Sequence, residues 1–254
     1  MTTVFVPYHQ DDRLPDGCVP HPAEGPVRTI DPPLPEGGLW QRLTALYDAV
    51  AAAAAADMEA GGVPTVLSGD CLVSLGAVAG AQRAGLDPAI VWFDAHGDVH
   101  TAESSTSGYL GGMSLRLVMG AHPEWAAQPL GMRPIPAQRA VLVDARDLDP
   151  AEADYLAADG PARYGVEDVG PAVLPDGPLI LHVDLDVVDA GELSGMIFPV
   201  PGGPSSDAVL GAAQRVLATG RVVALDVACP WYPARDASEA DRRAAVLGRL
   251  TALT

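Results

Sequence analysis

Short stretches rich in β-branched and apolar residues alternate with longer stretches of helical composition along this chain. Strands are predicted over residues 4–6, 65–67, 89–93, 140–143, 179–183 and 222–227. Helices are predicted over residues 39–59, 72–84, 112–119, 151–158, 206–218 and 237–250. This alternation favours a mostly parallel sheet with helices on both faces and a ligand site at the carboxyl ends of the strands. We therefore predict an α/β fold of three layers, αβα.

Size and composition indicate one domain over residues 1–254. The chain is 48% hydrophobic, no shift in composition marks a boundary, and the proline-rich segments 11–35 and 129–136 are expected to be surface loops. No apolar stretch approaches the roughly 18 residues of a membrane span, and the N-terminus lacks the features of a signal peptide. Three scattered cysteines agree with a reducing compartment. We expect a cytoplasmic protein with no membrane partner.

The charge of the chain excludes several classes of function. Its formal net charge is −18, and all 15 of its basic residues are arginines. Nucleic-acid binding requires a basic face, so no nucleic-acid partner is expected. Without lysine, the chain can form neither a Schiff base nor the lysine-containing phosphate loop of nucleotide-binding proteins. The negative charge slightly favours a cationic small molecule.

Two acidic runs directly follow predicted buried strands. The first contains Asp94, His96 and Asp98, and the second contains Asp184 and Asp186. Residues at positions i, i+2 and i+4 of an extended segment point the same way, so the side chains of each run converge. Carboxylates converge in this way only around cations or protons. We therefore predict a pair of divalent metal ions at the carboxyl edge of the sheet.

Other interpretations of the residues near these runs stay open. Cys71 begins a predicted helix and is either a metal ligand or a small buried side chain. His182 is either a packed residue behind the ligands or a catalytic group. Asp70 is expected to cap the helix or to support the ligands. Three further histidines, in polar or proline-rich stretches, are expected to face solvent: His9, His21 and His122.

These motifs resemble, in order and spacing, those of the arginase and agmatinase (ureohydrolase) superfamily. The resemblance extends over residues 65–232. Residues 68–71 resemble the family's G-G-D-H run, residues 94–98 its D-A-H-x-D, residues 145–152 its R-D-x-D-P-x-E, residues 182–189 its S-x-D-x-D-x-x-D, and residues 199–203 its P-x-P-G-G. The family holds two manganese ions at the carboxyl edge of a parallel sheet. The resemblance therefore implies an arginase-like fold and a binuclear metal centre.

The resemblance also implies a role for each candidate metal ligand. Asp94 and Asp184 would bridge both ions, Cys71 and Asp98 would complete one site, and His96 and Asp186 would complete the other. Manganese (Mn²⁺) is the first candidate for both ions, because carboxylates with imidazole suit it. The thiolate of Cys71, which stands where the family has a histidine, also admits zinc (Zn²⁺) or another softer ion. Water activated by two such ions would attack a guanidino carbon.

Several departures from the family motifs concern catalysis and substrate binding. Gly111 stands where arginases carry a proton-shuttling histidine, and His100 stands where they use an asparagine to hold the substrate's α-carboxylate. Asp98 and His100 are therefore our candidate catalytic residues. The candidate substrate-binding residues are His100, Ser107, Tyr109, Asp149, Glu152 and Cys229.

Three of these candidates carry a more specific expectation. Asp149 and Glu152 resemble arginase acids that hold the substrate's α-amino group, although acids are also common in the first turn of a helix. Cys229 stands where arginases place a glutamate against the guanidinium. A fully charged guanidinium would therefore lack its partner, which favours a less basic substrate.

The sequence thus predicts hydrolysis of a carbon–nitrogen bond in a linear guanidino compound, an arginine-like amino acid such as N-hydroxyarginine. The product would be urea or a urea analogue. One alternative is a hydrolase of formimino, amidino or ureido compounds. Another is a catalytically silent relative that only binds metal or ligand. The resemblance further implies a homo-oligomer.

Overall fold

In the computed structural model, which describes residues 2–20 and 25–254, eight strands form one sheet of the order β4-β1-β5-β10-β9-β6-β7-β8. All neighbours within it pair in parallel. The strands are β1 (Thr3–Val6), β4 (Val27–Thr29), β5 (Thr65–Ser68), β6 (Ala89–Asp94), β7 (Ala140–Asp144), β8 (Ala162–Tyr164), β9 (Leu179–Asp184) and β10 (Val222–Ala228). A separate antiparallel pair consists of β2 (Tyr8–His9) and β3 (Asp12–Arg13).

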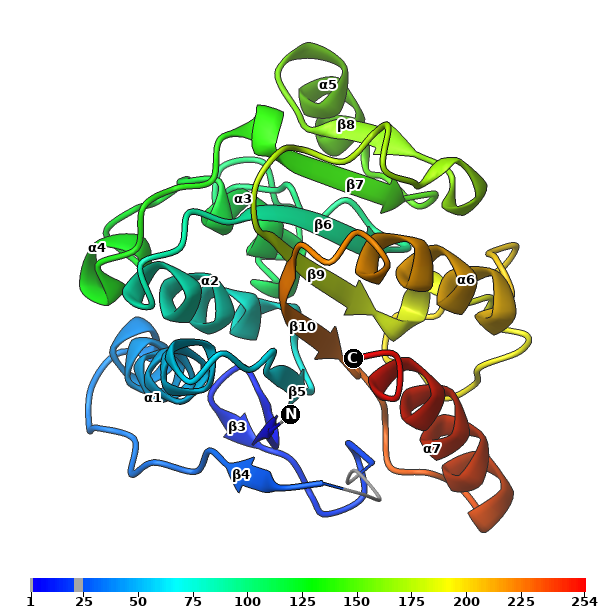
Figure 1. The fold of residues 1–254 in the computed structure, drawn as a ribbon, viewed down its shortest axis with the longest axis horizontal. Coiled ribbons are helices and arrows are strands. Elements are labelled where there is room, and N and C mark those ends of the chain that lie inside the picture. The colour runs from blue at the N-terminus through cyan, green and yellow to red at the C-terminus, as the bar shows by residue number, and fades with distance from the viewer. Residues whose placement is uncertain (1, 21–24) are drawn as a thin grey trace.

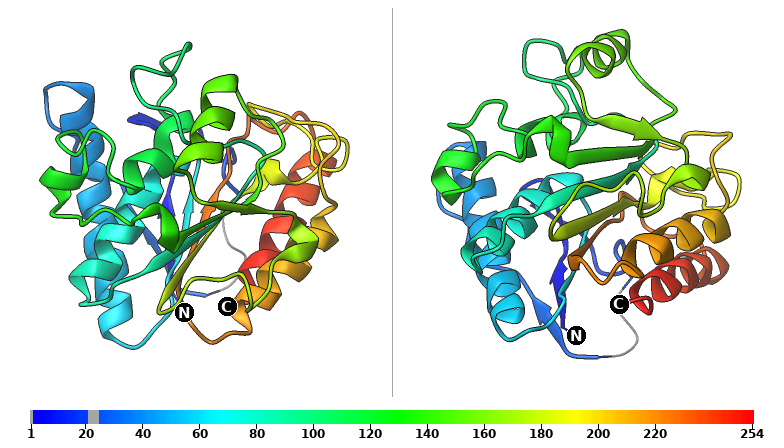
Figure 2. Two further views of the ribbon diagram at one scale, coloured as in Figure 1. Left: turned by 90° about the horizontal axis from the view of Figure 1, so that it is seen from above. Right: turned by 45° about the horizontal axis from the view of Figure 1, so that its top comes forward.

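Helices cover both faces of this sheet (Figure 1). The helices are α1 (Leu39–Glu59), α2 (Ser74–Arg83), α3 (Ser114–Val118), α4 (Ala127–Leu130), α5 (Pro150–Ala158), α6 (Ser206–Leu217) and α7 (Ala237–Thr251). Short 3-10 helices include η1 (Cys71–Val73), η2 (Gly111–Met113) and η5 (Leu185–Val187). Figure 2 shows the sheet edge-on, with α1 and α2 on one side and α6 and α7 on the other. The predicted three-layer αβα fold is confirmed.

The central strands are buried on both faces, and their side chains alternate between two hydrophobic clusters. Trp92 of β6 packs in the cluster that contains α1 and α2, whereas Phe93 packs in the cluster that contains α6 and α7. Ile180 and Leu181 of β9 alternate in the same way. Since side chains alternate with a period of two, the even-numbered residues of both strands face α1 and α2.

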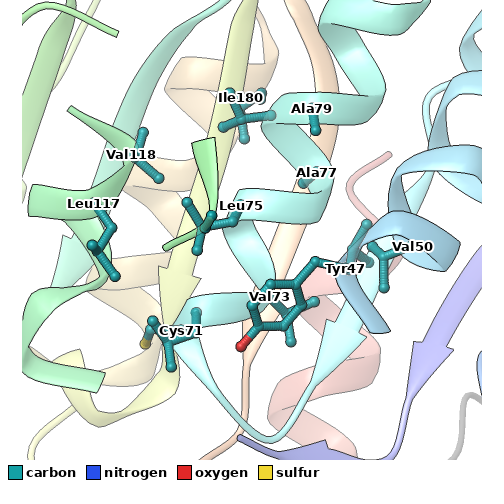
Figure 3. Close-up of a cluster of buried hydrophobic side chains, with 14 of the residues drawn as sticks. Tyr47, Val50, Cys71, Val73, Leu75, Ala77, Ala79, Leu117, Val118 and Ile180 are labelled. Atoms are coloured by element: carbon teal, nitrogen blue, oxygen red, sulfur yellow. The ribbon is translucent and has the colours of Figure 1, made fainter. Parts of the chain in front are cut away.

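Close packing of α2 against α1 holds the segment that follows β5. A Cβ atom on Gly76 would lie 2.9 Å from the carbonyl oxygen of Tyr47, so only glycine permits this approach. In Figure 3, Leu75, Ala77 and Ala79 follow one another along α2, while Cys71 lies at the margin of the cluster. The packing thereby positions Cys71 at the carboxyl end of β5.

The sequence predicts the six long strands and six of the helices, but it misses β2, β3, β4 and β8. These strands are only two or three residues long, and Tyr8 of β2 is the one buried residue among them, so they lack a pattern of buried side chains. The expectation of a surface loop over 11–35 is wrong in part, because β4 adds an edge strand beside β1. The predicted helix 72–84 divides into η1 and α2. That residues 1–254 form a single domain stays a prediction.

Of the helices in residues 2–20 and 25–254, none combines the length and the apolarity that crossing a membrane requires.

Candidate metal centre

The two acidic runs meet where neighbouring strands end. Asp94 is the last residue of β6, Asp184 is the last residue of β9, and these two strands are paired. Asp186 lies in η5, and Asp98 lies in the loop after β6. All four carboxyl groups belong to residues that are at most 5% exposed. The sheet therefore gathers four buried aspartates at its carboxyl edge.

His96 joins two of these aspartates into a first group of possible ligands. Its Nδ1 lies 3.3 Å from Oδ1 of Asp94 and 3.1 Å from Oδ2 of Asp186. The backbone N–H of Ala95 donates to Oδ1 of Asp186 at 3.2 Å and holds that carboxylate in place. One ligand atom from each of Asp94, His96 and Asp186 lies within 4.8 Å of the others, which is close enough for one ion to bind all three.

A second group of possible ligands consists of Cys71, Asp94 and His182, whose ligand atoms also lie within 4.8 Å of one another. The thiol of Cys71 donates to Oδ2 of Asp184 at 2.8 Å. Burial and the charge of Asp184 raise the pKa of Cys71 well above its usual value, so the thiol keeps its proton unless a cation replaces it. Since both groups share Asp94, this carboxylate lies between two possible cation positions.

Among the described residues, His96 is the one basic side chain that pairs with the cluster, through Asp94 and Asp186. No arginine in the described part of the chain forms an ion pair with the carboxylates of Asp94, Asp98, Asp184 or Asp186. Burial and repulsion from Asp94 raise the pKa of Asp98 well above its usual value, and burial with repulsion from Asp186 does the same for Asp184. Cations would remove this repulsion.

Two buried polar atoms at the cluster have no hydrogen-bond partner among the described residues. They are Oδ2 of Asp98 and Nε2 of His182. Buried polar groups are nearly always paired, and an unpaired one commonly marks an ion or a water that completes the site. The donor set and its two unpaired atoms therefore fit a pair of divalent cations.

His100, Asp149 and Glu152 form a polar wall beside the cluster. Nε2 of His100 lies 3.0 Å from Oδ2 of Asp149 and 3.8 Å from Oε2 of Glu152. Glu152 accepts hydrogen bonds from the backbone N–H groups of Val99 and Asp149, at 3.2 and 3.1 Å. Glu152 therefore stabilises the start of α5, as expected of a first-turn acid, and also lines the cavity.

Tyr109 occupies the space beside Gly111. A Cβ atom on Gly111 would lie 2.4 Å from the ring of Tyr109, so no larger residue fits there while Tyr109 keeps its position. The Tyr109 hydroxyl lies 3.3 Å from Nε2 of His9, and the two rings stack with centroids 5.9 Å apart. The aromatic ring of Tyr109 thus fills the space that a histidine side chain at position 111 would need.

These groups surround a cavity of about 280 Å³. Its lining includes eleven of the candidate residues: Cys71, Asp94, His96, Asp98, His100, Ser107, Tyr109, Asp149, Glu152, Asp184 and Asp186. Phe198, which is 39% exposed and lies 4.8 Å from the Tyr109 ring, also contributes to this lining. The structure thereby brings together every sequence-derived candidate except Cys229.

Cys229 does not line the cavity. It is fully buried and packs in the cluster that contains α6 and α7, on the face of the sheet opposite Asp226. The alternation of side chains at the end of β10 turns the Cys229 thiol away from the site. The structure therefore does not support our assignment of Cys229 to substrate binding.

The histidines outside the motifs also differ from expectation. His9 and His122 do not simply face solvent, because His9 stacks on Tyr109 and His122 stacks on Trp125 with ring centroids 4.1 Å apart. His21 lies outside the described residues. Asp70 does cap the segment, since its Oδ1 accepts from the N–H of Leu72 at 2.7 Å. The contact between His9 and Tyr109 spans 100 residues, so no local motif announces it.

The chain is similar to proteins whose names describe guanidino hydrolysis. An arginase of Eremothecium gossypii is 33% identical over 198 residues, which make up 72% of this chain and 49% of that protein. An N(omega)-hydroxy-L-arginine amidinohydrolase of Streptomyces lavendulae is 30% identical over 205 residues, which make up 78% of this chain and 71% of that protein. The chain spans about half the length of several curated relatives that it matches.

The fold is similar to that of a solved arginase as well. The native structure of the Bacillus caldovelox arginase superposes with a TM-score of 0.78 at 25% identity, over 98% of this chain and 97% of that one. The family model described as "Arginase family" matches residues 29–251, which is most of the chain. Together with the fold and the acidic cluster, this match shows that the chain belongs to the arginase family.

Proposed function

We propose that this protein binds two divalent cations and hydrolyses a carbon–nitrogen bond of an arginine-like guanidino compound, with N-hydroxyarginine preferred over arginine. One observation carries the proposal: four buried aspartates converge with Cys71 and His96 at a cavity, and no arginine of the described residues pairs with them. The names of the relatives support the class of substrate.

Each side chain of the cluster has a proposed part in holding the cations. Asp94, His96 and Asp186 would hold one, Cys71 and Asp98 would hold the other, and Asp94 and Asp184 would contact both. When bound, two such cations lower the pKa of a water toward about 7 and polarise the group under attack. The unpaired Oδ2 of Asp98 is directly available for this role.

His100 is the proposed proton donor to the leaving amine. Among the described residues that line the cavity, the imidazoles are those of His96 and His100, and His96 is already assigned to a cation. The His100 ring is held in place because Nδ1 lies 3.1 Å from the hydroxyl of Ser104 and Nε2 lies 3.0 Å from Asp149. These contacts fix the imidazole at the wall that it forms with Asp149 and Glu152.

The preference for a less basic substrate rests on the position of Cys229. The side chain that stands in place of the family's guanidinium-binding glutamate is a thiol buried on the other face of the sheet. A guanidinium in the cavity would therefore lack the carboxylate that balances its charge. An N-hydroxyguanidine carries less positive charge at neutral pH and depends less on that partner.

A side-by-side assay tests this proposal. Purified protein, with Mn²⁺ added, is incubated with L-arginine and with N-hydroxy-L-arginine, and urea release is measured together with the metal content per chain. We expect about two ions per chain and a higher kcat/KM for N-hydroxy-L-arginine. The variant Asp184→Asn, which removes a proposed bridging carboxylate, is expected to lose both ions and activity.

Faster urea release from arginine would reject N-hydroxyarginine as the preferred substrate, but the proposed reaction class would stand. Formamide release from formimino compounds, without urea from either guanidino compound, would replace the proposal by the alternative hydrolase. A wild-type chain that binds no metal would reject the proposed function altogether.

A further inference from the structure

We propose that His182 is itself a metal ligand, which binds through Nε2 to the ion held by Cys71 and Asp94. This inference rests on the proposed metal centre and extends it. It assigns a ligand at a position where the family motif S-x-D-x-D has a serine. The imidazole of His182 would thereby compensate for the histidine that Cys71 replaces.

Strand geometry directs His182 toward the cluster. It lies two residues before Asp184 on β9, so both side chains project from the same face of the strand. One of its ring nitrogens lies within 4.8 Å of the ligand atoms of Cys71 and Asp94, and all three residues are buried. Three atoms at this spacing can surround one ion.

The contacts of the ring leave Nε2 free to bind a cation. Nδ1 lies 2.7 Å from Oδ2 of Asp226, and its N–H donates a hydrogen bond to this carboxylate. Nε2 of the neutral ring then carries a lone pair. Metal-binding histidines commonly donate their second nitrogen to a carboxylate in this way, which fixes the tautomer and the direction of the ring.

The ring is also held by Trp92. The two rings stack with centroids 3.6 Å apart, and the indole N–H of Trp92 donates to Oδ2 of Asp94 at 3.0 Å. His182 is fully buried, and its Nε2 has no hydrogen-bond partner among the residues that the structure describes. A rigid imidazole with an unpaired, buried nitrogen beside a thiol and a carboxylate is a preformed ligand.

This assignment makes the two cation positions chemically different. Cys71 and His182 add thiolate sulfur and imidazole nitrogen at one position, and this combination favours Zn²⁺ or Co²⁺. The position of Asp94, His96 and Asp186 keeps more oxygen ligands and suits Mn²⁺. We infer that the native centre takes a softer ion at the Cys71 position than at the His96 position.

Metal binding by a selective variant tests the inference without an activity assay. His182→Asn keeps an amide near the place of Nδ1, where it donates to Asp226, and removes the nitrogen at Nε2. Titration with Co²⁺ is followed by the absorption band that a thiolate gives when it binds cobalt. The affinity of the Cys71 position is expected to fall about 10- to 100-fold, and the thermal midpoint of the metal-free protein should change little. His122→Asn, at a histidine outside the cluster, is the matched control.

A measurement on the wild-type chain covers the case in which the variant does not fold. In cadmium-loaded protein with isotope-labelled histidine, NMR couplings between cadmium and imidazole nitrogen are expected for two rings, His96 and His182. Coupling to a single ring, or an unchanged cobalt titration in His182→Asn, would overturn the inference while leaving the proposed function standing. A wild-type protein that binds no metal would instead reject the proposed function.

Discussion

Cys71 is the residue at which the proposed metal centre departs most from its family. Four aspartates with one thiolate carry five negative charges against the four positive charges of two divalent ions. A histidine at this position would carry no charge and would leave the ligand set one unit less negative. The side chain at position 71 therefore influences both the charge of the centre and the kind of ion that it binds.

Replacing Cys71 tests this effect directly. The variant Cys71→His is expected to raise the preference for Mn²⁺ over Zn²⁺ by about tenfold or more, because an imidazole is a harder ligand than a thiolate. Competition between the two ions, read as bound metal per chain, measures the change. Cys71→Ala serves as the control that removes the ligand without replacing it. An unchanged preference in Cys71→His would show that residue 71 does not bind the ion.

At the scale of elements, the loop after β6 and the start of α5 depend on one close contact. A Cβ atom on Gly97 would lie 2.8 Å from Oε1 of Glu152, whose carboxylate is already held by two backbone N–H groups. The next residue, Asp98, has a φ of +52°, in the left-handed region. The loop that presents Asp98 is thus shaped by glycine and by the acid of α5.

Gly97→Ala is therefore expected to destabilise the protein by about 1–3 kcal/mol, because Glu152 must move away from its donors. Its KM should also rise, since Glu152 and Asp149 line the cavity. Gly248→Ala is the matched control, because a Cβ atom there meets nothing within 4 Å and alanine favours the helix by about 1 kcal/mol. Urea denaturation measures the free energy of unfolding of both variants. Equal stability changes would contradict the proposed contact.

Tyr109 and Gly111 form a second pair of coupled positions, in the segment that leads into η2. Gly111→His alone is expected to lose about 1–3 kcal/mol of stability, because its side chain overlaps the Tyr109 ring. Adding Tyr109→Asn, which opens the space, should recover most of that loss. A double-mutant cycle measures the coupling. Strict additivity of the two changes would mean that the side chains do not compete for one space.

At the scale of the whole molecule, the cluster links stability to pH and to metal. Burial raises the pKa of Asp186 from 3.8 to about 6, and burial raises those of Asp98 and Asp184 well above their usual value. The unfolded chain loses these protons near pH 4. With respect to these groups, the metal-free protein is therefore most stable below pH 4 and becomes less stable as pH rises through 6 and beyond.

Bound cations replace these protons, so the metal-loaded protein should not lose stability in this way. The difference in thermal midpoint between metal-loaded and chelator-treated protein is expected to widen from pH 5 to pH 7 by at least about 4 °C, which corresponds to roughly 1–2 kcal/mol for a chain of this size. Thermal scans at matched ionic strength measure it. A difference that stays constant or narrows would show that these carboxylates are not the metal ligands.

The layers of this protein and the acidic residues of its centre can be predicted from the sequence alone. The alternation of apolar strands and helices predicts a parallel sheet, and the i, i+2 spacing of Asp94, His96 and Asp98 directs these side chains toward one point. Both inferences depend on periodicities within a short segment. The structure retains the strands and brings these side chains together, but His96 and Asp98 lie beyond β6, in a bend and in a loop where Asp98 has a φ of +52°. The short edge strands β4 and β8 are not predicted, because three mostly exposed residues carry no such periodicity.

Contacts between residues of different strands, in contrast, depend on the three-dimensional arrangement of the chain. The strand order β5-β10-β9-β6 places Asp226 of β10 beside His182 of β9, 44 residues apart, and so turns an ambiguous histidine into a candidate ligand. The alternation of side chains at the end of β10 leaves Cys229 on the far face, while a loop brings Tyr109 into the space beside Gly111. Spacing along the chain sets where a side chain points, but strand order and loop packing set what it meets.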